Sequence, residues 1–114
     1  MNIKQREAGN VVVLELSGKL MGGDDAAVFQ NRIKDILGQG HKKILINLGS
    51  LSWINSTGLG ILISGYTSVK NAGAVLKLAN VAERIQSILM ITKLATVFDS
   101  YSTEEEALAS FEKE

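Results

Sequence analysis

The side chains best placed to do chemistry are two adjacent hydroxyls, Ser56 and Thr57, within the segment Asn55-Ser56-Thr57-Gly58-Leu59-Gly60. Before this segment the chain is apolar over residues 44–48, interrupted only by Asn47, as in a strand that is covered on both faces. After it, apolar side chains recur at helical spacing: Leu59, Leu62, Ile63, Tyr66 and Val69. The hydroxyls are therefore predicted at the start of a helix, where they are exposed and reachable.

Two roles are open to a hydroxyl at a helix start. It can accept a hydrogen bond from a free backbone N–H group of the first turn, and so cap the helix. It can instead accept a phosphoryl group, which would add charge at that point of the surface. The local residues alone leave both roles open for Ser56 and Thr57.

Enzymatic chemistry finds little support in the sequence. A Ser-His-Asp hydrolase would need His41, the only histidine, but Ser56 lacks the G-x-S-x-G pattern and His41 lies in a predicted surface turn. The pair Gly58 and Gly60 lacks the third glycine of a dinucleotide loop, because Ile63 stands in its place. The sequence therefore predicts a protein that is not an enzyme and has no cofactor.

The acidic clusters are explained by structure rather than by metal binding. Asp24-Asp25 and Glu104-Glu105-Glu106 stand at predicted helix starts, where negative charge is favourable, and they have no partner at metal-ligand spacing. Asp24 or Asp25 is predicted to cap one helix. Ser102 with Glu105, or Thr103 with Glu106, offers a capping box for the last helix.

The remaining elements alternate along the chain and predict one α/β domain over residues 1–114. Strands are predicted over residues 3–7, 11–16, 43–48, 75–79 and 96–98. Helices are predicted from residues 24 or 25 to 38, from 57 to 71, over an apolar stripe at 81–89, and over 107–111. Because crossovers are right-handed, the sheet is predicted to be mixed but mostly parallel, with four to five strands and about four helices.

Charge and composition exclude several classes of partner. Twelve basic and twelve acidic residues cancel, so neither nucleic acid nor an anionic membrane is predicted as the main partner. There is no cysteine, signal-peptide core or apolar run long enough to span a bilayer. We therefore expect a cytoplasmic protein without direct membrane insertion. The sequence leaves open whether the chain forms a homodimer.

The hydroxyl segment, with its flanking strand and helix, resembles the Asp-Ser-Ser/Thr-Gly-Leu-Gly signature of the STAS domain, the fold of bacterial anti-anti-sigma factors. Leu16-Ser17-Gly18-Lys19-Leu20 is similar to that family's L-x-G-x-L motif, and Leu76-Lys77-Leu78-Ala79-Asn80-Val81 to the strand and turn after the phosphoacceptor helix. Residues 94–98 and the closing STEEEALASF also fit, so the resemblance covers essentially the whole chain.

The resemblance implies a protein switch gated by phosphorylation. Such a chain binds an ATP-dependent anti-sigma factor serine kinase and so releases a sigma factor, until phosphorylation of Ser56 ends the binding; a serine phosphatase would reverse it. The implied partner-binding residues are Asn55, Thr57, Gly58, Trp53, Gly22, Gly23 and Asp24. Within this set Thr57 is a cap or a second acceptor, and Gly58 lets a partner backbone approach, as does Gly60.

Two residues or segments depart from the family pattern. Asn55 stands where the family usually has Asp, and Asn55→Asp is therefore expected to speed phosphorylation. The loop Met21-Gly22-Gly23-Asp24-Asp25 differs from the family's acidic loop and is expected to help select the partner. The neutral Asn55 also fits an alternative, in which the domain is an unswitched scaffold in a signalling assembly or an accessory subunit of a lipid transporter. Trp53 is either a core anchor or an exposed partner contact.

Overall fold

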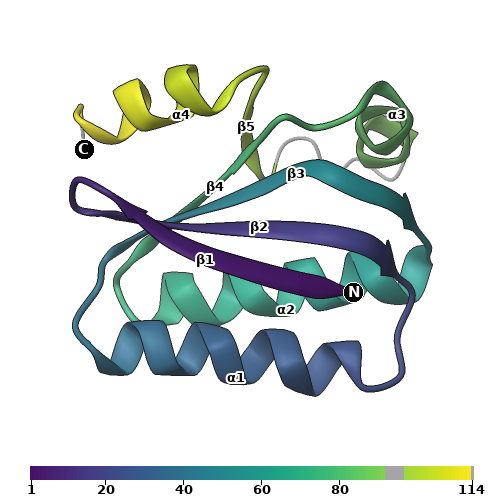
Figure 1. The fold of residues 1–114 in the computed structure, drawn as a ribbon, viewed down its shortest axis with the longest axis horizontal. Coiled ribbons are helices and arrows are strands. Elements are labelled where there is room, and N and C mark those ends of the chain that lie inside the picture. Colours follow the sequence, from purple (N-terminus) through teal and green to yellow (C-terminus); the bar gives the residue numbers. More distant parts are fainter. Residues whose placement is uncertain (92–96, 114) are drawn as a thin grey trace.

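The computed structural model describes residues 1–91 and 97–113 (Figure 1). Its strands are β1 (Asn2–Ala8), β2 (Val11–Leu20), β3 (Lys43–Ile54), β4 (Val75–Ala79) and β5 (Asp99–Tyr101). Its helices are α1 (Asp25–Gly38), α2 (Ser56–Asn71), α3 (Glu83–Ile91) and α4 (Glu104–Phe111). The strands of the described ranges form one sheet in the order β1-β2-β3-β4-β5, in which β1 is antiparallel to β2 and the other pairs are parallel. The predicted α/β class with a mixed, mostly parallel sheet is confirmed.

Helices cover both faces of this sheet (Figure 1). α1 and α2 lie side by side on one face and enclose the main core, where Phe29, Ile33 and Val69 are buried. α4 lies on the other face and packs Ala107 and Phe111 against the sheet. Because alternate strand residues point to opposite faces, β2 supplies both layers, which explains the unbroken apolar run over residues 11–14.

β3 is longer than the predicted strand over residues 43–48. Gly49 and Ser50 do not end it, because its parallel pairing with β2 resumes beyond an irregularity in register and continues to Ile54. Leu51 and Ile54 are buried, so the far half of β3 also contributes to the core. The strand therefore leads directly into the segment that carries the two hydroxyls.

The predicted strand over residues 96–98 is wrong where the structure describes it. Residue 96 lies outside the described residues, whereas Val97 and Phe98 form a turn and a bend, and β5 begins at Asp99. Phe98 is buried and packs edge-on against the ring of Tyr66, with 5.4 Å between the ring centroids. Its apolar character thus reflects packing against α2 rather than strand pairing.

The helix caps follow the sequence in part. Thr103 is the N-cap of α4, and its hydroxyl accepts a hydrogen bond from the backbone N–H of Glu106, as predicted. Asp24 occupies the N-cap position of α1, but its side chain makes no capping hydrogen bond. The apolar stripe predicted at 81–89 lies mostly within α3, which begins at Glu83. Val81 therefore precedes the helix.

Candidate functional site

Ser56 is the first residue of α2, and only Asn55 separates it from the end of β3. The loop from β2 to α1 lies at the same end of the molecule as the connection from β3 to α2 (Figure 1). Ser56 is exposed, and within residues 1–91 and 97–113 its hydroxyl has no hydrogen-bond partner. His41 lies at the opposite end of β3, close to Glu7, so it is not placed to act on Ser56.

The cap of α2 is Asn55, which corrects the expectation that Ser56 or Thr57 caps the helix. The side-chain oxygen of Asn55 accepts a hydrogen bond from the backbone N–H of Gly58 at 2.8 Å. Its extended backbone is typical of an N-cap residue, and its carbonyl accepts the N–H of Leu59 at 2.9 Å. The Ser56 hydroxyl is therefore not part of the cap.

Asn55 also joins the helix start to the loop between β2 and α1. Its side-chain N–H donates to the backbone carbonyl of Met21 at 3.1 Å. Thr57 contacts the same loop through its methyl group, since a Cβ built on Gly22 would lie only 2.9 Å from Thr57 Cγ2. Gly22 has φ +114°, where a side chain would be strained. The residues on both sides of Ser56 thus hold this loop in place.

The predicted site residues of the loop and of the helix start are brought together by these contacts. Gly22 lies beside Thr57, while Gly23 and Asp24 follow it on the surface and are exposed. Gly58 is different, because it is buried and a Cβ there would lie 1.9 Å from the carbonyl oxygen of Leu20. The expectation that Gly58 lies open to a partner backbone is wrong. Its missing side chain lets α2 pack against the end of β2.

Trp53 is an exposed side chain and not a core anchor. It retains 40 % of its accessible surface, although Leu51 and Ile54 on either side are buried. The guanidinium carbon of Arg84, from α3, lies 5.8 Å from the centre of its ring. Lys19 is opposite Trp53 on β2. Two cationic residues therefore neighbour Trp53, which is itself three residues before Ser56.

Sequence reasoning included Met21 only as part of the loop expected to help select the partner, and it missed Arg84 as a neighbour of the site. Met21 follows the L-x-G-x-L motif and is 45 % exposed. The position of Met21 directly after this motif is the sequence signal that could have pointed to it. Arg84 comes from a different helix, and nothing in the local sequence links it to Trp53.

The charge around Ser56 is unevenly distributed. The first turn of α2 contains no acidic side chain, and its free N–H groups and helix dipole favour an anion there. Lys19 and Arg84 lie on the side of Trp53, whereas Asp24 and Asp25 lie at the start of α1. An anionic group on Ser56 would therefore be tolerated by its own helix.

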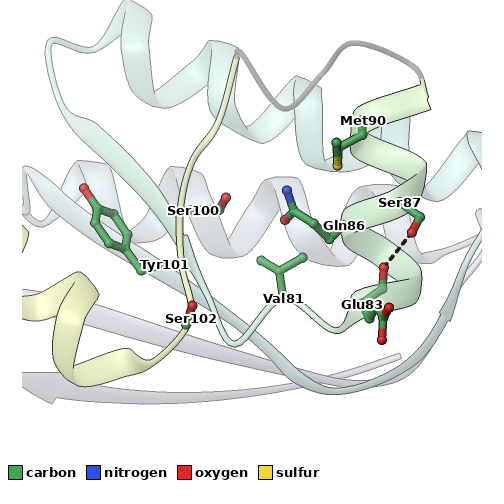
Figure 2. A pocket seen from close by; sticks show the side chains of 8 residues that line it. All are labelled: Val81, Glu83, Gln86, Ser87, Met90, Ser100, Tyr101 and Ser102. Atoms are coloured by element: carbon green, nitrogen blue, oxygen red, sulfur yellow. Dashed lines mark hydrogen bonds between the residues drawn. The ribbon is translucent and has the colours of Figure 1, made fainter.

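A surface hollow of about 540 Å³ lies elsewhere, between α3 and β5 (Figure 2). Figure 2 shows Val81 and Gln86 between these two elements, while the ring of Tyr101 points away from α3. Serine hydroxyls, Met90 and the carboxylate of Glu83 complete the lining, and none of the described residues contributes a cationic side chain to it. The hollow includes none of the predicted site residues, and its lining does not favour a phosphate group.

The contacts of Asn55 lead to a prediction for the family's usual carboxylate. We expect Asn55→Asp to lower the free energy of unfolding by about 1 kcal/mol, because an ionised carboxylate still caps Gly58 but leaves the Met21 carbonyl without a donor. Asn55→Ala should cost more, since the cap is lost as well. Urea unfolding of the three proteins measures the order of their unfolding free energies. An aspartate variant as stable as the parent would mean that the Met21 hydrogen bond has no net effect.

Comparison with known proteins agrees with this architecture. The sequence pattern of the STAS domain matches residues 2–107. The chain belongs to the STAS domain family. This STAS domain is 32 % identical over 98 residues to a Thermotoga neapolitana protein named as an anti-sigma factor antagonist. The aligned region covers 85 % of this chain and 87 % of that relative. It is 30 % identical over 99 residues to the anti-sigma-B factor antagonist of Bacillus subtilis, and the aligned region covers 87 % of each chain.

Solved structures share the fold. The phosphorylated form of the Bacillus protein SpoIIAA matches this STAS domain with a TM-score of 0.72 at 20 % identity, over 96 % of this chain and 99 % of that one. A sulfate transporter family protein of Wolinella succinogenes matches with a TM-score of 0.71 at 19 % identity, over 90 % and 85 % of the two chains. At these identities the likeness concerns the fold alone. Among the described helices, none combines the length and the apolar character needed to cross a membrane.

Proposed function

We propose that this STAS domain is an anti-anti-sigma factor, which binds an anti-sigma factor serine kinase until Ser56 is phosphorylated. One observation carries the proposal: the Ser56 hydroxyl is exposed at the first residue of α2, while Asn55 already caps that helix. Modification of Ser56 therefore sacrifices no capping hydrogen bond. The family and the names of its relatives support the same assignment.

The switch follows from where the new charge is placed. The kinase would transfer the γ-phosphoryl group of ATP to the Ser56 oxygen, with loss of the hydroxyl proton and release of ADP. The product carries about −1.5 to −2 charge at neutral pH. The start of α2 tolerates this charge through its N–H groups and dipole, so the fold persists. A partner surface that had closed over a neutral hydroxyl would have to desolvate a dianion, and the complex would dissociate.

In this proposal the chain supplies a binding surface and a phosphoacceptor, and the kinase supplies ATP and the catalytic groups. A serine phosphatase in the same cytoplasm would restore the binding form by removing the phosphate. Thr57 is the secondary acceptor, because its hydroxyl is adjacent to Ser56 and is not used by the cap. Asn55, Gly22, Gly23 and Asp24 border the surface that the kinase would cover.

A second candidate function is an unswitched role, as a scaffold in a signalling assembly or as an accessory subunit of a lipid transporter. The neutral Asn55 favours it, because the family's usual carboxylate before the acceptor is missing. In that case the chain would copurify with membrane components or with a stable assembly rather than with an ATP-binding kinase.

Intact mass measured on protein from native cells tests the proposal. We expect a species heavier by one phosphate, which disappears on phosphatase treatment and maps to Ser56. The Ser56→Ala variant, expressed in the same cells, is the control and should lack this species. Absence of phosphate from Ser56 under conditions that change sigma-factor activity would contradict the proposal.

A further inference from the structure

Two of the exposed large apolar residues belong to the segments that meet at the start of α2. Among the described residues, the large apolar side chains that remain exposed are Met21, Val28, Trp53, Met90 and Val97. The register of β2 and β3 pairs Lys19 with Trp53 and Leu20 with Ile54, so Met21 and Asn55 follow as adjacent residues. The hydrogen bond from Asn55 to the Met21 carbonyl confirms this adjacency. Met21 is therefore a direct neighbour of Asn55, and Trp53 precedes Ser56 by three residues.

Both side chains have the properties of interface anchors. Trp53 is fixed on a strand, and Arg84 covers part of its ring, so little rotamer freedom is left to lose on binding. Met21 is flexible and adapts its shape to an apolar partner. Tryptophan, arginine and methionine are enriched where protein interfaces are buried, and tryptophan and arginine often carry much of the binding energy.

The charges beside Trp53 define the partner surface that would fit. Lys19 lies opposite Trp53 on β2, and Arg84 lies over its ring. Glu83 adjoins Arg84 on α3, and Asp24 belongs to the loop on the other side of Asn55. An apolar pocket bordered by carboxylates would complement the two cations around the ring. A phosphate on Ser56 would then repel those carboxylates, in addition to its own desolvation cost.

We infer that Met21, Trp53 and Arg84, here called the Trp53 patch, anchor the kinase in an apolar pocket that carries carboxylates at its rim. This inference rests on the proposed function, because the occupant of the patch is the same kinase that would modify Ser56. It adds the residues that hold the partner and the chemistry of the surface that it presents.

Binding affinities of single variants test the patch. The probe is the anti-sigma serine kinase of the source organism, purified through its binding to the Ser56→Ala protein. Met21→Ala and Trp53→Ala should each weaken binding at least fivefold, a typical threshold for an interface anchor. Arg84→Gln should weaken binding and reduce its dependence on salt, because one cation is removed. Met90→Ala is the matched control, since Met90 is 65 % exposed but lines the hollow beside β5; its affinity should change less than twofold.

A second measurement needs no variant. Trp53 is the only tryptophan, so protein labelled with 5-fluorotryptophan gives a single ¹⁹F resonance. We expect the unlabelled kinase to shift this resonance at saturation, and Ser56 phosphorylation to return it to the position of the free protein. Thermal unfolding of each variant shows whether its fold is retained.

The outcomes separate the patch from the switch. If Ser56→Asp abolishes binding while the Met21 and Trp53 variants bind normally and the ¹⁹F signal is unmoved, the patch is wrong and the proposed function stands. If Ser56→Asp binds as well as the parent, the proposed function itself fails. Weakened binding by Met90→Ala to the same extent as by Met21→Ala would also overturn the patch, since the effect would not be local.

Discussion

Replacing Gly58 with alanine is expected to cost about 3 kcal/mol of folding free energy, at the upper end of what overpacking usually costs. The new Cβ would lie 1.9 Å from the carbonyl oxygen of Leu20 and 3.0 Å from the side chain of Ile54. Both neighbours belong to the paired ends of β2 and β3, which cannot move aside without disturbing the sheet. The start of α2 must therefore shift, and Ser56 with it.

Gly60, two residues further along α2, is the matched control. A Cβ there meets nothing within 4 Å, so Gly60→Ala should raise stability by about 0.5–1 kcal/mol through helix propensity alone. Urea unfolding of both variants measures the difference in their unfolding free energies. The slopes of free energy against urea concentration are compared as well. Equal effects at the two positions would show that the contact between Gly58 and Leu20 does not constrain the helix.

Ser56→Asp should weaken binding of the kinase at least tenfold, whereas Ser56→Ala should bind within about twofold of the unmodified protein. A tenfold loss corresponds to about 1.4 kcal/mol, which is modest for burying a new carboxylate in an interface. The aspartate carries one charge and the phosphate nearly two, so the variant gives a lower bound for the effect of phosphorylation. Neither change touches the cap, since that is made by Asn55. Both variants should therefore remain folded.

Thr67→Asp separates a local effect from a change of net charge. Thr67 is exposed on the same helix, three turns beyond Ser56, and its hydroxyl donates to the backbone carbonyl of Ile63. A carboxylate at this position should leave the affinity for the kinase nearly unchanged. Titration calorimetry with the purified kinase measures all four proteins. Equal affinity of the parent, the alanine variant and the aspartate variant at position 56 would end the switch hypothesis.

The sequence by itself determined the order and type of most elements and the place of the hydroxyls. Apolar stripes at helical spacing predicted α1 and α2 because each helix packs one face against the sheet. The apolar run over residues 44–48 predicted β3, because both faces of the sheet are covered there. These signals repeat over many residues, so single exceptions do not obscure them. The resemblance of the 55–60 segment added the family, which the comparisons confirm.

Tertiary structure decided which residue does what at the site. Ser56, Thr57 and Asn55 are all good N-cap residues, and only the end of the pairing between β2 and β3, at Leu20 and Ile54, made Asn55 the cap. Gly49 and Ser50 are typical of a strand end, yet pairing with β2 carried β3 through them. The contact between Arg84 and Trp53, and the hydrogen bond from Asn55 to Met21, join segments about 30 residues apart. Such contacts depend on how the helices and loops pack around the sheet, and local residue patterns carry no information about that packing.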